Sequence, residues 1–149
     1  MIMDDHIYKS HNKTLLLYHL VFPAKYRKKV FDNTVDITLK ETCLEISQNY
    51  EINFVEIGND EDHVHFLVQS VPMYSVTKIV TTIKSITARE IFSHHKELKK
   101  KMWGASLWTS GYYVNTVGMY ASRDTIVQYI KNQGKERKYS KIHQGSLEL

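Results

Sequence analysis

The segment NDEDHVHFLVQS (residues 59–70) has two histidines one residue apart, behind three acids and at the head of an apolar run. Since successive side chains of a β-strand point to opposite faces, a strand here places His63 and His65 together on one face. The other face then carries Val64, Phe66 and Val68, which have the character of a core. Two imidazoles on one rigid surface can supply two ligands to a metal ion. The alternative interpretation is a pair of partly buried histidines that bind nothing.

Further predicted strands lie on both sides of this segment. Residues 51–59 also alternate, and Gly58-Asn59-Asp60 has the composition of a turn, so the two strands are predicted to form a hairpin. Residues 14–22 form an apolar run closed by Pro23, and residues 112–117 form the last predicted strand.

Three segments space their apolar residues as helices do: residues 34–50, 75–95 and 122–134. In the first, Ile37, Leu39, Cys43, Leu44 and Ile46 roughly follow this spacing. In the second, the apolar face is made by Val76, Ile79, Val80, Ile83, Ile86 and Ile91, and Ser75 is the expected N-cap. Ser122 is expected to begin the third helix and Gly134 to end it. Residues 24–33 and 96–104 are predicted to be basic connections.

The predicted order of elements is therefore β-α-β-β-α-β-α, and its first six elements match the split βαβ, ferredoxin-like pattern. This is an α+β fold, an antiparallel sheet with helices on one face, here followed by a C-terminal helix. Because the fold hosts many functions, it does not identify the activity.

Composition predicts a single domain over residues 1–149, with a core at about 14–134 and a polar tail at 135–149. Hydrophobic residues make up 42% of the chain, enough for a sizeable core, which argues against disorder. The one cysteine, Cys43, excludes an intrachain disulfide and is expected to be buried. The N-terminus lacks an apolar signal core, and no apolar run is long enough to span a bilayer. We expect a cytoplasmic protein with no membrane partner.

The last predicted helix carries a second pair of reactive groups. Tyr129 and Gln133 lie four residues apart, on one helical face. A tyrosine hydroxyl can act as a nucleophile when it is activated, and a glutamine carbonyl oxygen can bind a metal ion. An ordinary amphipathic helix with a half-buried tyrosine fits the same spacing. Among the ten tyrosines, the rivals as nucleophile are Tyr112, Tyr113 and Tyr120, the first two being more typical of packing in a strand.

Positive charge is clustered, within a formal net charge of +4. The first cluster carries four cations and one aromatic ring, a combination suited to phosphate contact and base stacking: Lys25, Tyr26, Arg27, Lys28 and Lys29. The other two clusters are Lys99, Lys100 and Lys101, and Lys131, Lys135, Arg137, Lys138 and Lys141. A phosphodiester substrate would account for all three clusters, whereas a solvated surface would account for each alone.

Four motifs occur in one order along the chain: YHLVFPAKYRKKVF (18–31), DHVHFLV (62–68), LWTSGYYVNTVG (107–118) and QYIKNQ (128–133). In sequence and spacing they resemble the single-tyrosine transposases of the insertion sequence (IS) 200/605 family, which belong to the HUH (His-hydrophobe-His) nucleases. The resemblance extends from about residue 14 to residue 133, most of the chain.

This resemblance implies a dimeric enzyme that recognises subterminal hairpins and cuts and rejoins single-stranded DNA at the ends of a mobile element. His63, His65 and Gln133 match the family's ligands to Mg²⁺ or Mn²⁺, and Tyr129 matches its nucleophile. The tyrosine forms a 5′-phosphotyrosine link that a second 3′-OH resolves, so no nucleotide cofactor is needed. The active site is often composite, with the histidines of one subunit facing the tyrosine helix of the other.

Other functions remain open on the sequence alone. A non-catalytic or domesticated DNA- or RNA-hairpin-binding protein of the same fold has no need for the nucleophile Tyr129. A metal-dependent hydrolase without a covalent step would keep its activity in Tyr129→Phe, whereas a transposase would lose cleavage and retain binding.

Overall fold

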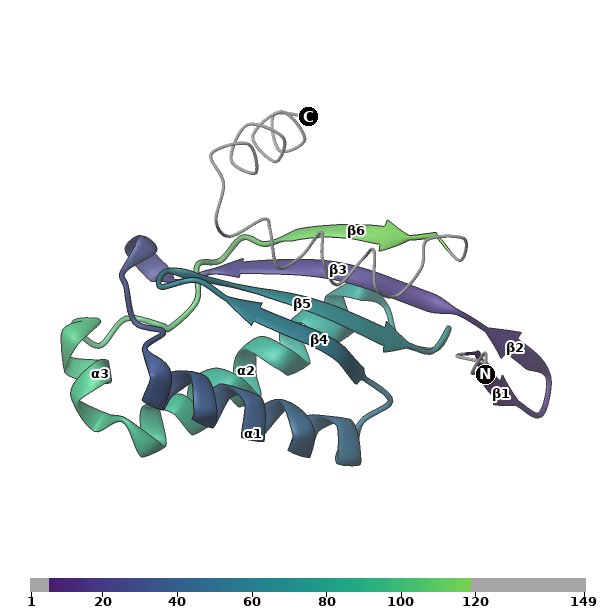
Figure 1. Cartoon of the computed structure of the whole chain (residues 1–149), viewed down its shortest axis with the longest axis horizontal. Coiled ribbons are helices and arrows are strands. Elements are labelled where there is room, and N and C mark those ends of the chain that lie inside the picture. Colours follow the sequence, from purple (N-terminus) through teal and green to yellow (C-terminus); the bar gives the residue numbers. More distant parts are fainter. Residues whose placement is uncertain (1–5, 119–149) are drawn as a thin grey trace.

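The computed structural model describes residues 6–118, and its central element is a four-stranded antiparallel sheet (Figure 1). Its strands are β3 (Leu16–Pro23), β4 (Asn53–Asn59), β5 (His63–Ser70) and β6 (Tyr113–Val117), in the spatial order β4-β5-β3-β6. The two central strands are thus the first and third of the four along the chain. This order confirms the predicted α+β, ferredoxin-like arrangement of the first six elements.

Two long helices, α1 (Asn33–Asn49) and α2 (Val76–His94), cover one face of this sheet (Figure 1). Each begins at a side chain that accepts a hydrogen bond from the first helical turn. Asp32 accepts from the backbone N–H of Val35 at 2.9 Å, and Ser75, the predicted N-cap, accepts from that of Lys78 at 3.0 Å.

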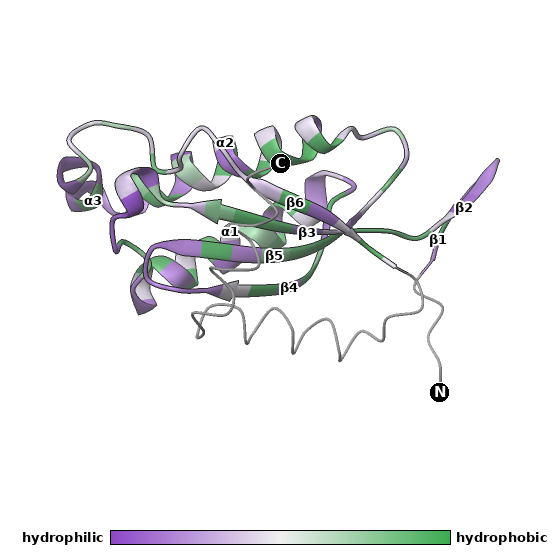
Figure 2. Ribbon diagram, turned by 90° about the horizontal axis from the view of Figure 1, so that it is seen from above, coloured by the Kyte–Doolittle hydropathy of each residue, from purple (hydrophilic) through white to green (hydrophobic). Residues whose placement is uncertain are grey.

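The sheet has a helical face, toward α1 and α2, and an outer face, away from them. Leu20, Phe22, Val64, Phe66 and Val68 point to the helical face and join the main core with the buried residues of both helices. Figure 2 shows apolar residues along much of β3 and β5. Because side chains alternate, His63, His65, Leu67 and Gln69 of β5 lie on the outer face.

The structure differs from the predicted elements in two connecting regions. Residues 96–104, expected to be a loop, begin with a short helix, α3 (Lys96–Lys101). Lysine, glutamate and leucine are good helix formers. Because Leu98 is the one buried side chain of α3, the sequence of this helix has no apolar periodicity that would predict it. Before β3, an unpredicted hairpin joins β1 (Ile7–Lys9) to β2 (Asn12–Thr14).

Two details of the apolar pattern also differ. Ile37 and Leu44 are 57% and 64% exposed, because the buried face of α1 runs through Val35, Leu39 and Cys43. Cys43 is buried as expected.

In β4 a register shift between Phe54 and Glu56 lets both Phe54 and Ile57 pack on the core. β4 continues to Asn59, so the hairpin turn begins at Asp60, two residues later than the predicted start at Gly58.

The predicted helix 122–134, with Tyr129 and Gln133, and the predicted tail 135–149 lie outside the described residues. Within residues 6–118, no helix is both long enough and apolar enough to cross a membrane.

Candidate metal centre

His63 and His65 lie side by side on the outer face of β5. Their ring centroids are 5.0 Å apart with the ring planes at 70°, and the residues are 6% and 1% exposed. β5 is hydrogen-bonded on both edges, and His65 pairs with Gly58 of β4 and with Val21 of β3. A central strand therefore holds both imidazoles on a rigid surface at the separation that one ion can bridge.

Asp62 orients His63. Oδ1 of Asp62 lies 2.7 Å from Nδ1 of His63, and Oδ2 accepts a hydrogen bond from Nε of Arg27 at 3.1 Å. Burial raises the pKa of the Asp62 carboxyl, but the hydrogen bonds from His63 and Arg27 outweigh this and leave it below its usual value. The ionised carboxylate accepts, so Nδ1 of His63 carries the hydrogen, and in the neutral imidazole Nε2 then carries the lone pair that a metal ion binds.

The neighbouring acids have other contacts. Oδ2 of Asp60 lies 3.7 Å from Nε2 of His63, beyond hydrogen-bond distance but close enough to favour a cation there. Glu61 instead approaches Lys29, with 3.5 Å between Oε2 and Nζ. Of the three acids ahead of the histidines, Asp62 is thus the one in contact with Nδ1.

His19 makes the corresponding contact to His65. Nε2 of His19 lies 3.1 Å from Nδ1 of His65, and the rings stack with centroids 5.4 Å apart. For His65 to present a lone pair on Nε2, its Nδ1 must carry the hydrogen and donate it to Nε2 of His19. Sequence reasoning missed His19, although a histidine within the apolar run LLLYHLVF was a signal that a polar partner lies across the sheet.

The chemistry of this donor set fits a divalent cation. Two neutral imidazoles leave the charge of the ion intact, and beside Nδ1 of each lies a group that can accept its hydrogen and so favour the metal-binding tautomer. In residues 6–118 no three side chains of histidine, cysteine, aspartate or glutamate are grouped to hold a metal. The predicted third ligand, Gln133, is of another type and, like Tyr129, lies outside the described part of the chain.

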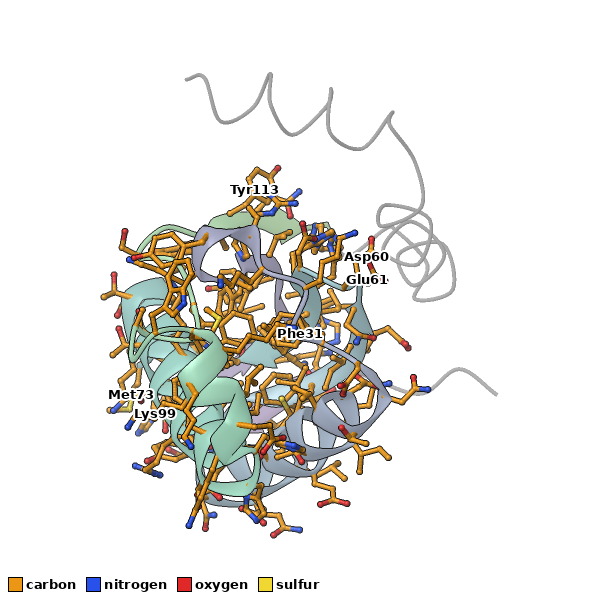
Figure 3. The ribbon with its side chains drawn as sticks, turned by 90° about the vertical axis from the view of Figure 1, so that its left-hand side faces the viewer. Phe31, Asp60, Glu61, Met73, Lys99 and Tyr113 are labelled. Carbon is orange, nitrogen blue, oxygen red and sulfur yellow. The ribbon has the colours of Figure 1, made fainter. Side chains whose placement is uncertain are left out.

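Two of the rival tyrosines can be placed. Tyr113 lies on the outer face, with its ring centroid 6.1 Å from that of His19 (Figure 3). Tyr112 packs against Phe22, 6.5 Å between centroids, and is a packing residue as expected. Tyr113 is therefore the described tyrosine that an experiment must compare with Tyr129.

The predicted DNA-binding residues lie on the short 3₁₀ turn η1 (Lys25–Arg27) and the two residues after it. Tyr26, Arg27 and Lys29 are exposed, whereas Lys25 and Lys28 are half-buried. Backbone hydrogen bonds from Ala24 N–H to Asp62 O (2.8 Å) and from Phe31 N–H to Glu61 O (3.0 Å) hold this loop against the β4–β5 turn. The loop therefore lies at the end of the sheet where His63 begins β5.

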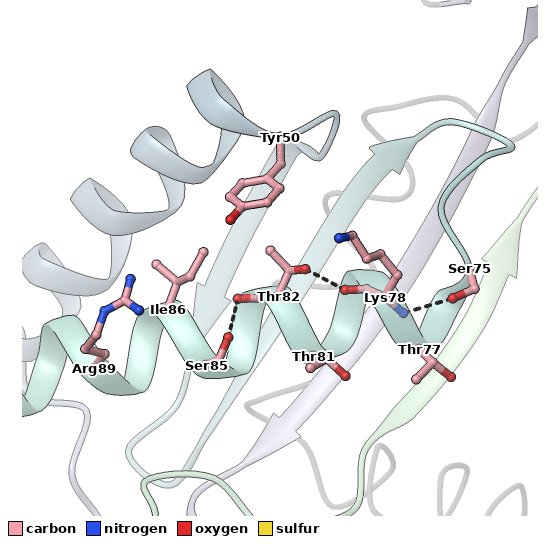
Figure 4. Close-up of a pocket in the computed structure, with 9 residues that line it drawn as sticks. All are labelled: Tyr50, Ser75, Thr77, Lys78, Thr81, Thr82, Ser85, Ile86 and Arg89. Atoms are coloured by element: carbon pink, nitrogen blue, oxygen red, sulfur yellow. Dashed lines mark hydrogen bonds between the residues drawn. The ribbon is translucent and has the colours of Figure 1, made fainter.

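A pocket lies on the opposite side of the molecule. Tyr50 and polar residues of α2, among them Lys78 and Arg89, line it (Figure 4). None of these residues belongs to the histidine cluster, so the pocket is not the candidate metal centre.

Comparisons with known proteins agree on one family. The model described as "Transposase IS200 like" matches residues 12–133. The ISDra2 transposase TnpA of Deinococcus radiodurans is 32% identical over 118 residues, covering 79% of this chain and 84% of that protein. The transposase of insertion sequence element IS200 from Salmonella typhimurium is 28% identical over 136 residues, covering 91% and 88%.

Two solved structures have a similar fold. A crystal structure of a transposase from Deinococcus radiodurans R1 matches with a TM-score of 0.70 and 32% identity, covering 85% of this chain and 97% of that chain. A REP-associated tyrosine transposase, solved with a REP hairpin, matches with a TM-score of 0.50 and 11% identity over 83% and 70%, a likeness of fold alone. With the family model matching most of its length, the chain belongs to the IS200-like family and is a transposase of the IS200/605 group.

Proposed function

We propose that this transposase cuts and rejoins single-stranded DNA through a covalent bond to Tyr129, with Mg²⁺ or Mn²⁺ held by His63, His65 and Gln133. The observation that carries the proposal is the pair of imidazoles on β5, each with Nδ1 in contact with a group that can accept its hydrogen. A plain hairpin-binding protein has no use for two histidines oriented in this way.

Tyr129 would supply the nucleophile. Its phenol oxygen loses its proton to solvent and attacks the phosphorus, the bond between phosphorus and the 3′ oxygen breaks, and that oxygen takes up a proton from solvent to become a free 3′-OH. The 5′ end stays joined to the tyrosine as a phosphodiester. Because this bond keeps the phosphoryl group activated, the 3′-OH of another strand can displace the tyrosine, and no nucleotide cofactor is required.

The other residues would position the metal-binding histidines and neutralise the charge of the phosphates. The bound ion would offset the charge that develops on the phosphate oxygens. Asp62 keeps the hydrogen of His63 on Nδ1, and His19 does the same for His65. Lys25, Lys28 and Lys29 would contact backbone phosphates near the cut, while Arg27 is bound to Asp62 and acts on His63 through it.

The DNA partner would be a single strand with subterminal hairpins. The REP-associated tyrosine transposase with a similar fold was solved bound to a REP hairpin, and the resemblance of the four motifs supports a hairpin ligand here. The same resemblance supports a homodimer in which the histidines of one subunit face Tyr129 of the other.

A denaturing gel tests the covalent step. The protein is mixed with labelled single-stranded DNA from the end of its own element, with Mn²⁺, Mg²⁺ or a chelator. We expect a metal-dependent band of DNA linked to protein, which disappears in Tyr129→Phe. Tyr113→Phe is the matched control, because it removes the hydroxyl of a tyrosine whose ring packs against His19 on the outer face and should leave the band unchanged.

Each other outcome points to a different function. Loss of the band in Tyr113→Phe but not in Tyr129→Phe would make Tyr113 the nucleophile. Cleavage that survives in both variants would indicate a metallonuclease without a covalent step. Tight hairpin binding with no band under any metal would indicate the non-catalytic hairpin-binding protein.

A further inference from the structure

Two large aromatic side chains are exposed at the end of the sheet where β5 begins. Trp103 is 78% exposed and Tyr26 is 61% exposed, and their ring centroids lie 6.2 Å apart at an angle of 49°. Tyr26 comes from the turn after β3, and Trp103 follows α3, 77 positions later in the sequence (103 − 26). We refer to these two rings as the aromatic platform.

The backbone at the platform is in a conformation that bulky residues rarely adopt. Tyr26, Arg27 and Trp103 have φ angles of 61°, 52° and 56°, and in residues 6–118 they are the non-glycine residues with positive φ. Such a conformation is unfavourable for side chains of this size and persists where the surrounding structure enforces it, often at functional sites. The fold thus holds both rings in solvent at a conformational cost.

Hydrogen bonds join the turn that carries Tyr26 to the segment that follows Trp103. Lys25 N–H donates to Leu107 O at 2.8 Å, and Thr109 N–H donates to Pro23 O at 3.0 Å. Beneath them the buried ring of Trp108 stacks on Phe31, with centroids 5.2 Å apart. The platform therefore has a fixed geometry before any ligand arrives.

Lysines flank both rings. Nζ of Lys28 lies 3.7 Å from the centroid of Trp103 and donates to the carbonyl oxygen of Lys101 at 3.0 Å. Nζ of Lys25 lies 5.5 Å from the centroid of Tyr26. Lys28 lies over one face of Trp103, and the exposure of this ring leaves its other face open. An open aromatic face next to cations matches a single-stranded nucleic acid, whose bases stack while its phosphates pair with lysines.

The platform adjoins the candidate metal centre through one residue. Arg27 follows Tyr26 directly and donates to Asp62 at 3.1 Å, and Asp62 contacts His63 at 2.7 Å. A strand whose phosphate reaches the histidines therefore has a neighbouring nucleotide within reach of the platform.

We infer that Trp103 and Tyr26 stack an unpaired base of the single-stranded DNA next to the metal centre, with Lys25 and Lys28 on the adjacent phosphates. This inference rests on the proposed function and adds to it a base-stacking site that includes Trp103. The site reads no particular base, because every base offers an aromatic face.

Trp103→Asn tests this inference and protects the fold, because asparagine tolerates a positive φ better than other residues except glycine. Binding of an unstructured deoxythymidine oligonucleotide is measured by fluorescence anisotropy, without metal. Since stacking of one base contributes about 5- to 150-fold in affinity, the variant should bind more weakly by a factor in this range. A closed hairpin without single-stranded flanks should bind both proteins equally.

Tryptophan fluorescence gives a second readout. The chain has two tryptophans, and Trp108 is 4% exposed. The oligonucleotide should quench the wild-type emission and leave that of Trp103→Asn unchanged. Tyr8→Ser is the matched control, because Tyr8 is 58% exposed beside Lys13 in the β1–β2 hairpin and should not alter affinity.

Several results would overturn the inference. Unchanged oligonucleotide affinity in Trp103→Asn would exclude stacking, as would an equal loss in Tyr8→Ser, which would make exposed aromatic surface in general responsible. A change in self-association with unchanged affinity would assign the platform to a protein contact. The denaturing gel measures the Tyr129 adduct of the wild-type protein independently of these binding experiments. A failure of the base-stacking inference is therefore distinguishable from a failure of the proposed function.

Discussion

Replacing His19 with leucine should lower the affinity of the protein for Mn²⁺ by about 10- to 100-fold, although His19 is not itself a proposed ligand. His19 and His65 are each 1% exposed, and Nε2 of the first lies 3.1 Å from Nδ1 of the second. Leucine has no hydrogen-bond acceptor. In the metal-binding tautomer of His65, the buried Nδ1–H would therefore lose its contact with residue 19.

The magnitude follows from two independent considerations. Removing one partner of a buried hydrogen bond costs about 1–3 kcal/mol. Losing the residue that orients a metal-binding histidine costs about 10- to 100-fold in affinity, or about 1.4–2.8 kcal/mol at 1.4 kcal/mol per tenfold. The two ranges agree, as expected if the hydrogen bond to His19 is what makes His65 an effective ligand.

Isothermal titration with Mn²⁺ in the absence of DNA measures this effect directly. His19→Gln should retain most of the affinity, because the amide oxygen of glutamine can take the place of Nε2 as acceptor. His94→Gln removes an exposed histidine of α2 and should change nothing. Thermal melting of each variant without metal shows whether it is folded. A folded His19→Leu protein that binds Mn²⁺ as tightly as the wild type would refute the orienting role of His19.

The remaining predictions concern stability and accessibility. Thr87→Val should lower the free energy of unfolding in urea by about 1–3 kcal/mol, with Thr87→Ser close to wild type, because the buried Nε1–H of Trp108 donates to Thr87 Oγ1 at 3.0 Å. Asp32→Ala should cost about 1 kcal/mol by removing the N-cap of α1, and Asp32→Asn much less. The hydrogen bond from Val35 lowers the pKa of the Asp32 carboxyl in the folded state. The difference in free energy of unfolding between the wild type and Asp32→Ala should therefore be largest above the usual pKa of a carboxyl group, and it should decrease as the pH falls through the lowered pKa. Burial and then the charge of Asp36 raise the pKa of the Cys43 thiol, so a thiol-specific reagent at pH 8 should leave native protein unmodified and react after addition of denaturant, and rapid labelling of native protein would contradict this.

The parts of the site that follow from local sequence could be predicted. In any strand, residues two apart point to the same face, so His63 and His65 share a face whatever the register of the strand, and the structure has them there. The contact of Asp62 with His63 is also local, since the two residues are adjacent in the sequence.

The parts of the site that depend on strand register or on irregular backbone could not be predicted from the sequence. His19 meets His65 because β3 and β5 pair in the register that sets Val21 opposite His65, a relation between residues far apart in the chain. Trp103 lies in a basic segment without apolar periodicity, where the sequence has no sign of α3 or of the positive φ after it. Its proximity to Tyr26 arises from hydrogen bonds between two loops, which no spacing rule anticipates.

The central position of β5 has a consequence for how the molecule opens. A strand bonded on both edges exchanges its amide hydrogens late, through large-scale unfolding, whereas loops and short turns open at little cost. The backbone amides of β5, the strand that carries both imidazoles, are therefore expected to exchange slowest. The amides of the loops beyond the end of the sheet are expected to exchange faster. Local opening of the loops can therefore occur many times without separating the two nitrogens that would hold the ion.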